Sequence, residues 1–249
     1  MTNLQVAELT KKEKRVLRKQ GVIDNKNRFQ TNNLSIKPIF PLTANQELAF
    51  KAYEEGNNLL LHGMAGTGKT FISLYLALRD VLTNGKQEQI HIVRSVVPTR
   101  DMGFLPGNHK EKSRVYEAPY YPIVNNLLSR GDAYDILKQK GIINFTTTSF
   151  IRGLTINDAI IIVDEMNNMT FHELDSIITR LGKNCKIVFC GDFRQSDLLK
   201  QSDKNGLLSF MEIVDKMRRF TYVEFGEEDI VRSGLVRDYI IQKSKLGIS

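Results

Sequence analysis

Eight consecutive residues have the types and spacing of a phosphate-binding loop. They read Gly63-Met64-Ala65-Gly66-Thr67-Gly68-Lys69-Thr70 and match the pattern G-x-x-x-x-G-K-[ST]. Glycines let the backbone curl so that successive N–H groups point at one anion, and the dipole of a helix beginning near Gly68 favours the same negative charge. We expect the Lys69 ammonium to reach the β- and γ-phosphates of a nucleotide and the Thr70 hydroxyl to ligate Mg²⁺.

A second pattern places two carboxylates at the end of an apolar run. The run Ile160-Ile161-Ile162-Val163 is followed by Asp164 and Glu165, which is typical of a buried strand with acidic groups at its carboxyl end. Asp164 is expected to hold Mg²⁺ through water, and Glu165 to orient and deprotonate an attacking water molecule. The second carboxylate favours hydrolysis over simple nucleotide binding.

A third apolar run, Val188-Phe189-Cys190, leads into Gly191-Asp192, and Gln195 follows three residues later. We expect Gln195 to contact both the γ-phosphate and the attacking water, and so to report the state of the nucleotide. The alternative is a surface glutamine that follows a turn.

These residues need strands that end beside one another. Short apolar runs predict strands over residues 58–62, 90–94, 142–147, 159–163, 186–190 and 221–225. Helices are expected over about 44–55, 69–82, 120–130, 170–181, 206–216 and 229–243, two of them opened by capping boxes at Thr43 and Thr170. Residues 95–118 contain prolines and glycines and are expected to be mostly loop. The alternation predicts an α/β fold of the P-loop NTPase (RecA-like) type, with a mostly parallel sheet and helices on both faces.

Basic residues gather near the N-terminus. The net charge is +7, and residues 1–37 hold nine basic and three acidic residues. Such a segment favours polyanions such as nucleic acid or an anionic membrane, and a solvated polar arm is the alternative. We therefore expect a basic N-terminal arm over residues 1–37 and an ATPase domain over residues 38–249.

The composition narrows the class of protein. With 41% hydrophobic and 25% charged residues, the chain is neither largely disordered nor fibrous. No apolar run approaches 18 residues and no signal peptide is visible, so no membrane contact is expected. The two cysteines, Cys185 and Cys190, cannot form a disulfide framework or a structural zinc site, which fits a reducing, cytoplasmic setting.

Further short motifs accompany the three patterns in a fixed order. They are Arg94, Gly103-Phe104-Leu105-Pro106-Gly107, Arg152-Gly153-Leu154-Thr155, Asn167, Thr179-Arg180-Leu181-Gly182 and Asp229-Ile230-Val231-Arg232. In this order the chain resembles the PhoH family of ATPases, and its compact, phage-type members in particular, from about Pro41 to Tyr239. That family is similar to the first motor domain of superfamily 1 helicases.

The resemblance implies an activity and its ligands. It implies Mg²⁺-dependent ATP hydrolysis coupled to nucleic acid, RNA in preference to DNA, in the host cytoplasm if a phage encodes the chain. It also implies that Gln46, just inside the first predicted helix, contacts the adenine edge. The alternative is that Gln46 only completes the capping box with Thr43.

The resemblance has a consequence for assembly as well. Helicases of superfamily 1 complete their ATP site with arginines from a second motor domain, and this chain has no room for one after Asp192. We therefore expect head-to-tail association into a ring, a hexamer, in which each protomer lends Arg232, or failing that Arg180, to its neighbour. An ion pair between Arg232 and Asp229 within one chain is the alternative.

Two other classes of function fit parts of the pattern. A kinase for a nucleotide or another small molecule would use the same loop, but Glu165 beside Asp164 favours water as the acceptor. A nucleotide-gated binding module would bind ATP and hydrolyse it very slowly. Three tyrosines in a basic neighbourhood could stack single-stranded bases or simply pack at a loop–helix junction: Tyr116, Tyr120 and Tyr121.

Overall fold

The structure is a computed structural model that describes residues 34–95, 114–151, 153–193 and 201–247. The chain divides into two units, Met1–Leu34 and Ser35–Ser249, and the described helices and strands all belong to the second. Nearly all of the expected basic arm lies outside the described residues. So do Arg152, Gln195 and the motif over residues 103–107.

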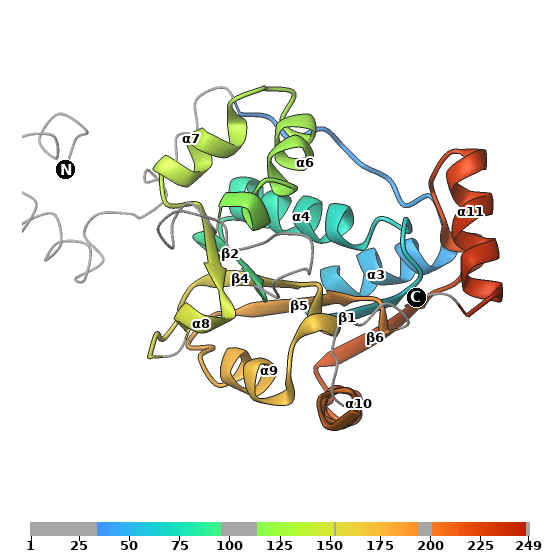
Figure 1. Ribbon diagram of the computed structural model, residues 1–249. Coiled ribbons are helices and arrows are strands. Elements are labelled where there is room, and N and C mark those ends of the chain that lie inside the picture. Colours follow the sequence, from blue (N-terminus) through green and yellow to red (C-terminus); the bar gives the residue numbers. More distant parts are fainter. Residues whose placement is uncertain (1–33, 96–113, 152, 194–200, 248–249) are drawn as a thin grey trace, which may run out of the picture. The chain divides into compact units, whose positions relative to one another are not determined.

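One sheet organises the second unit. Among the described residues it has six strands in the order β3-β2-β4-β5-β1-β6, and every neighbouring pair is parallel (Figure 1). The predicted α/β fold with a parallel sheet is confirmed, and each predicted strand agrees with the structure to within one residue at either end. The strands are β1 (Asn58–Gly63), β2 (Gln89–Arg94), β3 (Ile143–Thr147), β4 (Ala159–Asp164), β5 (Lys186–Gly191) and β6 (Phe220–Phe225).

The strand order brings the sequence motifs together. All six residues of β4 are buried, as expected for an apolar strand covered on both faces. In the sheet β4 lies between β2 and β5, and β5 lies next to β1. Because parallel strands end at one edge, the residues that follow β1, β4 and β5 meet there.

Helices cover both faces of the sheet. In Figure 1, α4 and α6 lie on one side of the sheet, and α9 and α10 lie on the other. The second side holds a core in which Leu174, Ile177 and Phe210 pack with Ile161 and Phe189 of the sheet. The helices are α3 (Ala44–Glu54), α4 (Lys69–Arg79), α6 (Tyr120–Leu127), α7 (Ala133–Gln139), α8 (Thr148–Ile151), α9 (Phe171–Ile178), α10 (Gln201–Asp215) and α11 (Gly234–Lys245), with short turns η2 (Asp80–Asn84), η3 (Met166–Asn168) and η5 (Glu227–Asp229).

Two predicted helix starts behave differently. Thr170 and Glu173 form the predicted capping box at α9, each side chain bonding to the backbone of the other residue. At α3, Thr43 accepts a hydrogen bond from the Gln46 backbone, but the Gln46 side chain accepts from the Leu42 N–H rather than from Thr43. The predicted box at Thr43 is therefore only half formed.

The C-terminal helix begins later than predicted. Instead of one helix over 229–243, the structure has the turn η5, an extended stretch, and then α11 from Gly234. The Val231 N–H donates to the Gly66 carbonyl in the phosphate loop, which holds the stretch out of the helix. In the predicted loop over 95–118, residues 114–117 are helical, and α7 was not predicted. None of the helices in the described ranges is both long and apolar enough to cross a lipid bilayer.

Candidate functional site

The phosphate loop leaves β1 in a conformation that depends on glycine. Gly63, Gly66 and Gly68 all have positive φ angles, of 123°, 76° and 84°. A Cβ atom on Gly63 would lie 2.2 Å from the Phe225 carbonyl oxygen of β6, so no other residue fits. Gly68 stands at the N-cap of α4 and offers no side-chain cap, so the first N–H groups of α4 are available to an anion.

Bonds from other segments fix the backbone of the loop. The Met64 N–H donates to the Phe225 carbonyl at 3.0 Å, and the Val231 N–H donates to the Gly66 carbonyl at 3.1 Å. The Gln46 Nε2 atom donates to the Thr67 carbonyl at 2.9 Å. The loop therefore has its shape set in advance by β6, by the stretch before α11 and by α3.

Lys69 lies over the loop with its ammonium group directed at backbone carbonyls. Its Nζ atom donates to the Gly63 carbonyl at 2.8 Å and to the Met64 carbonyl at 2.7 Å. Burial lowers the pKa of Lys69, and the nearby negative charge of Asp192 is the largest influence that opposes this shift. A buried cation beside free N–H groups of a helix start suits a highly charged phosphate group.

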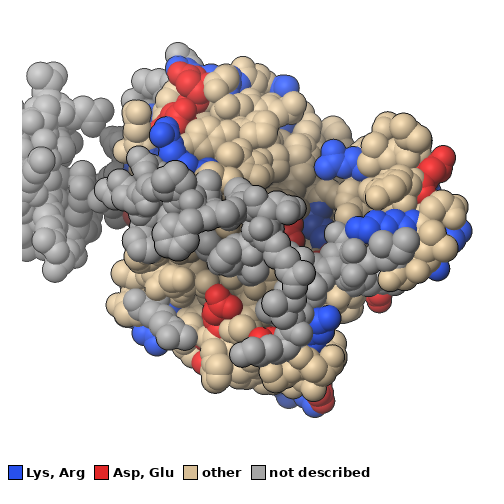
Figure 2. All heavy atoms as spheres, in the orientation of Figure 1, with Lys and Arg blue, Asp and Glu red and all other residues tan. Residues whose placement is uncertain are grey.

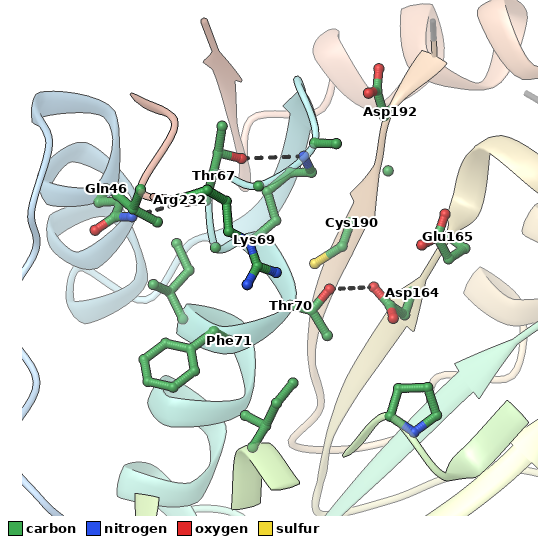
Figure 3. Close-up of a pocket in the computed structure, with 18 of the residues that line it drawn as sticks. Gln46, Thr67, Lys69, Thr70, Phe71, Asp164, Glu165, Cys190, Asp192 and Arg232 are labelled. Carbon is green, nitrogen blue, oxygen red and sulfur yellow. Dashed lines mark hydrogen bonds between the residues drawn. The ribbon is translucent and has the colours of Figure 1, made fainter. Parts of the chain in front are cut away.

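Thr70 and Asp164 form the candidate metal site. The Thr70 hydroxyl donates to Asp164 Oδ1 at 2.8 Å, so the two oxygens lie side by side below the loop (Figure 3). Mg²⁺ prefers oxygen ligands and is held by one or two protein groups together with water and phosphate oxygens. This hydroxyl–carboxylate pair fits that preference. Within the described part of the chain, no cluster of three or more His, Cys, Asp or Glu side chains offers another metal site.

Glu165 occupies an unusual backbone conformation at the end of β4. Its φ angle is 54°, in the left-handed region that a residue with a side chain seldom adopts. Burial raises the pKa of Glu165, the Asp164 charge raises it further, and the positive charges of Arg94 and Lys69 oppose both. A carboxylate with a raised pKa is a stronger base, and strained residues of this kind gather at functional sites.

A cavity of about 670 Å³ joins these groups. Its lining includes Gln46, residues 65–70, Asp164, Glu165 and Arg232, so most of the predicted site residues meet in one place. Gly63 and Met64 lie just behind it, bound to Lys69 through their carbonyls. In Figure 2 the surface is hollowed beside α11, and both basic and acidic side chains lie in the hollow.

Arg232 lines the cavity of its own chain. A Cβ atom on Gly66 would lie 2.9 Å from Arg232 Cγ, which shows how closely the side chain crosses the loop. The alternative ion pair with Asp229 is not what the structure shows. Asp229 Oδ2 accepts instead from Asn45 Nδ2 and from the Gly226 N–H. Arg180 follows α9 and is not part of the lining.

One residue of the site escapes prediction from the sequence. Tyr120 is one of the three tyrosines that could stack bases, but its side chain is fully buried and its hydroxyl donates to Asp164 Oδ2 at 2.9 Å. Tyr121 stacks on Tyr134 with ring centroids 4.0 Å apart. No spacing in the sequence links Tyr120 to Asp164, since the contact joins two separate motifs across the sheet edge.

Comparisons with known proteins identify the family of this chain. A model of the PhoH-like protein family matches residues 38–243. A PhoH-like protein of Bacillus subtilis is 33% identical over 84% of this chain and 65% of its own, and the protein PhoH of Escherichia coli is 32% identical over 80% and 56%. The chain thus spans about three-fifths of the length of these relatives. A Pif1 helicase structure from Candida albicans overlaps 84% of this chain and 44% of its own at 17% identity, with a TM-score of 0.38, too slight to add to what the sheet shows.

The bond from Gln46 to the loop allows a prediction that separates support of the loop from contact with a base. In the Gln46→Glu variant a carboxylate oxygen faces the Thr67 carbonyl in place of the amide donor. We expect the free energy of unfolding of the nucleotide-free protein to fall by about 1–3 kcal/mol, because a buried acceptor loses its donor. Urea denaturation measures this change.

The exposed neighbour Glu47 provides the control for this experiment. Glu47→Gln is expected to change the free energy of unfolding by less than about 0.5 kcal/mol. If Gln46→Glu leaves stability intact and alters only the preference for ATP over GTP, Gln46 serves the base and not the loop.

Proposed function

Because this chain belongs to the PhoH-like protein family, we propose that it binds ATP with Mg²⁺ and hydrolyses the ATP. We also propose that the reaction is coupled to nucleic acid, and to RNA in preference to DNA. The observation that carries the proposal is the meeting of Lys69, Thr70, Asp164 and Glu165 in one cavity. These are the groups that a hydrolytic nucleotide site needs: a cation for the phosphates, oxygen ligands for the metal, and a base for water.

Each side chain has a distinct task in this proposal. The N–H groups at the start of α4 and the Lys69 ammonium bind the β- and γ-phosphates. Thr70 and Asp164 would hold Mg²⁺, which would neutralise charge that develops on the phosphate oxygens. Glu165 accepts a proton from the water that attacks the γ-phosphorus, and its burial beside Asp164 raises its pKa, which makes it a stronger base.

Two substitutions separate binding from turnover. Lys69→Ala is expected to weaken ATP binding by at least about tenfold, because a charge-assisted bond to phosphate is lost. Glu165→Gln is expected to retain ATP binding and to lower kcat by about 10²–10⁴, because the base is lost. Binding is measured with a fluorescent ATP analogue, and turnover by phosphate release with no acceptor other than water.

Glu55→Gln makes the same chemical change at an exposed position and serves as the control. Phosphate release at the wild-type rate by Glu165→Gln would refute the assignment of the base. An acceptor-dependent reaction, with no release in water alone, would favour a kinase instead.

The proposed nucleic-acid partner is supported by charge. Nine of the 35 basic residues lie in residues 1–37, with three acids. Lysines and arginines that neutralise phosphates release counterions, so affinity falls as salt rises. The preference for RNA follows from the resemblance to the helicase-like family.

A charge-matched pair of variants tests the arm. Changing Lys11, Lys12, Lys14 and Arg15 together to Gln is expected to weaken single-stranded RNA binding and to reduce its salt dependence, by about 0.7 in slope for each RNA phosphate that is no longer neutralised. Basal ATP turnover should stay within about twofold, because the catalytic groups are untouched. Fluorescence anisotropy over a salt series provides the measurement.

The control removes four positive charges near α10, where the side chains are exposed: Lys204, Lys216, Arg218 and Arg219. An equal reduction of the slope in both variants would show that the arm is not the principal contact, and tighter binding to duplex DNA would overturn the preference for RNA.

We also propose that Arg232 acts on the γ-phosphate bound by its own chain. Its side chain lines the same cavity as Lys69, and its guanidinium makes no hydrogen bond or ion pair within the described part of the chain. An arginine at this place stabilises charge in the transition state and is worth about 10³–10⁵ in rate. A ring-forming hexamer remains our proposal for the assembly, with Arg180 as the residue that a protomer could lend to its neighbour.

Mixing experiments decide between the two arginines. Lys69→Ala and Arg232→Ala should each be inactive, and the mixture should stay inactive, because neither chain holds a complete set of groups. If Arg180 is shared, a mixture of Lys69→Ala and Arg180→Ala should regain ATP hydrolysis. Recovery of ATP hydrolysis in the first mixture would show that Arg232 acts in the site of a neighbouring protomer. If neither mixture recovers ATP hydrolysis, the proposal that protomers share an arginine within a ring is wrong.

A further inference from the structure

We propose that Tyr120 is a positioning residue for the divalent cation, which it serves by fixing the orientation of the Asp164 carboxylate. The inference rests on the proposed binding of ATP with Mg²⁺. Tyr120 begins α6, which packs against α4, while Asp164 ends β4. The contact therefore ties the metal site to a helix that is not part of the phosphate loop.

The two oxygens of Asp164 have different partners. Oδ1 accepts from the Thr70 hydroxyl at 2.8 Å, and Oδ2 accepts from the Tyr120 hydroxyl at 2.9 Å. Rotation of an aspartate carboxylate about its last torsion is broad when nothing restrains it. Donors on both oxygens, from α4 and from α6, select one orientation and leave Oδ1 facing Thr70.

The packing of the Tyr120 ring holds its hydroxyl in place as a hydrogen-bond donor. Its ring is fully buried and packs near Phe145 of β3, with ring centroids 5.9 Å apart. An ionised aspartate can only accept hydrogen bonds, so the Tyr120 hydroxyl is the donor in this contact.

Groups that orient a metal ligand influence the metal through that ligand. Loss of such a partner typically costs 10–100-fold in metal affinity or activity. Tyr120 itself does not touch the cation in this proposal. Its removal should therefore change how strongly Mg²⁺ assists nucleotide binding, and should leave nucleotide binding without Mg²⁺ unchanged.

Tyr120→Phe tests the inference because it removes one oxygen atom and keeps the buried ring. Binding of a fluorescent, non-hydrolysable ATP analogue is measured by titration with Mg²⁺ and again in EDTA, so turnover is not involved. We expect the half-saturating Mg²⁺ concentration to rise about tenfold or more, with the affinity in EDTA within about twofold of wild type.

The chain offers a closely matched control. Tyr134 lies in α7, away from the cavity, and is also fully buried. Its hydroxyl donates to Glu117 Oε1 at 2.9 Å. Tyr134→Phe should lower the melting temperature about as much as Tyr120→Phe but leave the Mg²⁺ titration unchanged. A merely structural role for Tyr120 would make the two variants behave alike in both measurements.

The outcomes separate this inference from the proposed function. If the wild type binds the analogue equally well with and without Mg²⁺, the proposed function fails. If Mg²⁺ assists the wild type and Tyr120→Phe to the same extent, only the role of Tyr120 is refuted. Should Tyr120→Phe fail to fold, Phe145→Leu loosens the same ring and must raise the half-saturating Mg²⁺ concentration at least about twofold, or the inference is wrong.

Discussion

The phosphate loop keeps its shape because three other segments bond to its backbone. Phe225 accepts from the Met64 N–H, Val231 donates to the Gly66 carbonyl, and Gln46 donates to the Thr67 carbonyl. Each bond satisfies a polar group of the loop backbone, and the positive φ angles of the glycines make the conformation possible. The shape of the cavity therefore depends on residues outside the loop, two of which, Gln46 and Val231, also line the cavity.

The order of the strands decides which charged side chains lie beside one another in the site. The β4 strand lies between β2 and β5, so the register that pairs Arg94 with Asp164 brings a cation beside the acidic pair, while Asp192 follows β5 next to Lys69. Buried charges of opposite sign interact more strongly than they would in water. The strained backbone at Glu165 belongs to this arrangement, since it turns the chain directly after β4 ends. The sheet thus sets both the position and the electrical environment of the reactive groups.

The motifs predicted the strands, the phosphate loop and the acidic pair because each has a pattern confined to a few residues. The spacing of Gly63 to Thr70 and the apolar run before Asp164 are local features, and the structure follows them closely. The features that could not be predicted are contacts between segments that lie far apart in the sequence. The bond from Tyr120 to Asp164, the second bond of Gln46 and the place of Arg232 depend on which strands are neighbours. The late start of α11 has the same origin, because a bond to Gly66 overrides a locally helical sequence.

The support of the loop by β6 and by the stretch around Val231 has a consequence for biosynthesis. The ribosome makes the loop before these two supports, and also before β5 and β6, the two neighbours of β1 in the sheet. At about 5–20 residues per second, roughly 10–30 s pass between translation of Gly66 and of Val231. A nascent chain therefore displays the motif without the site, and a ligand that binds only the folded form stabilises finished molecules alone.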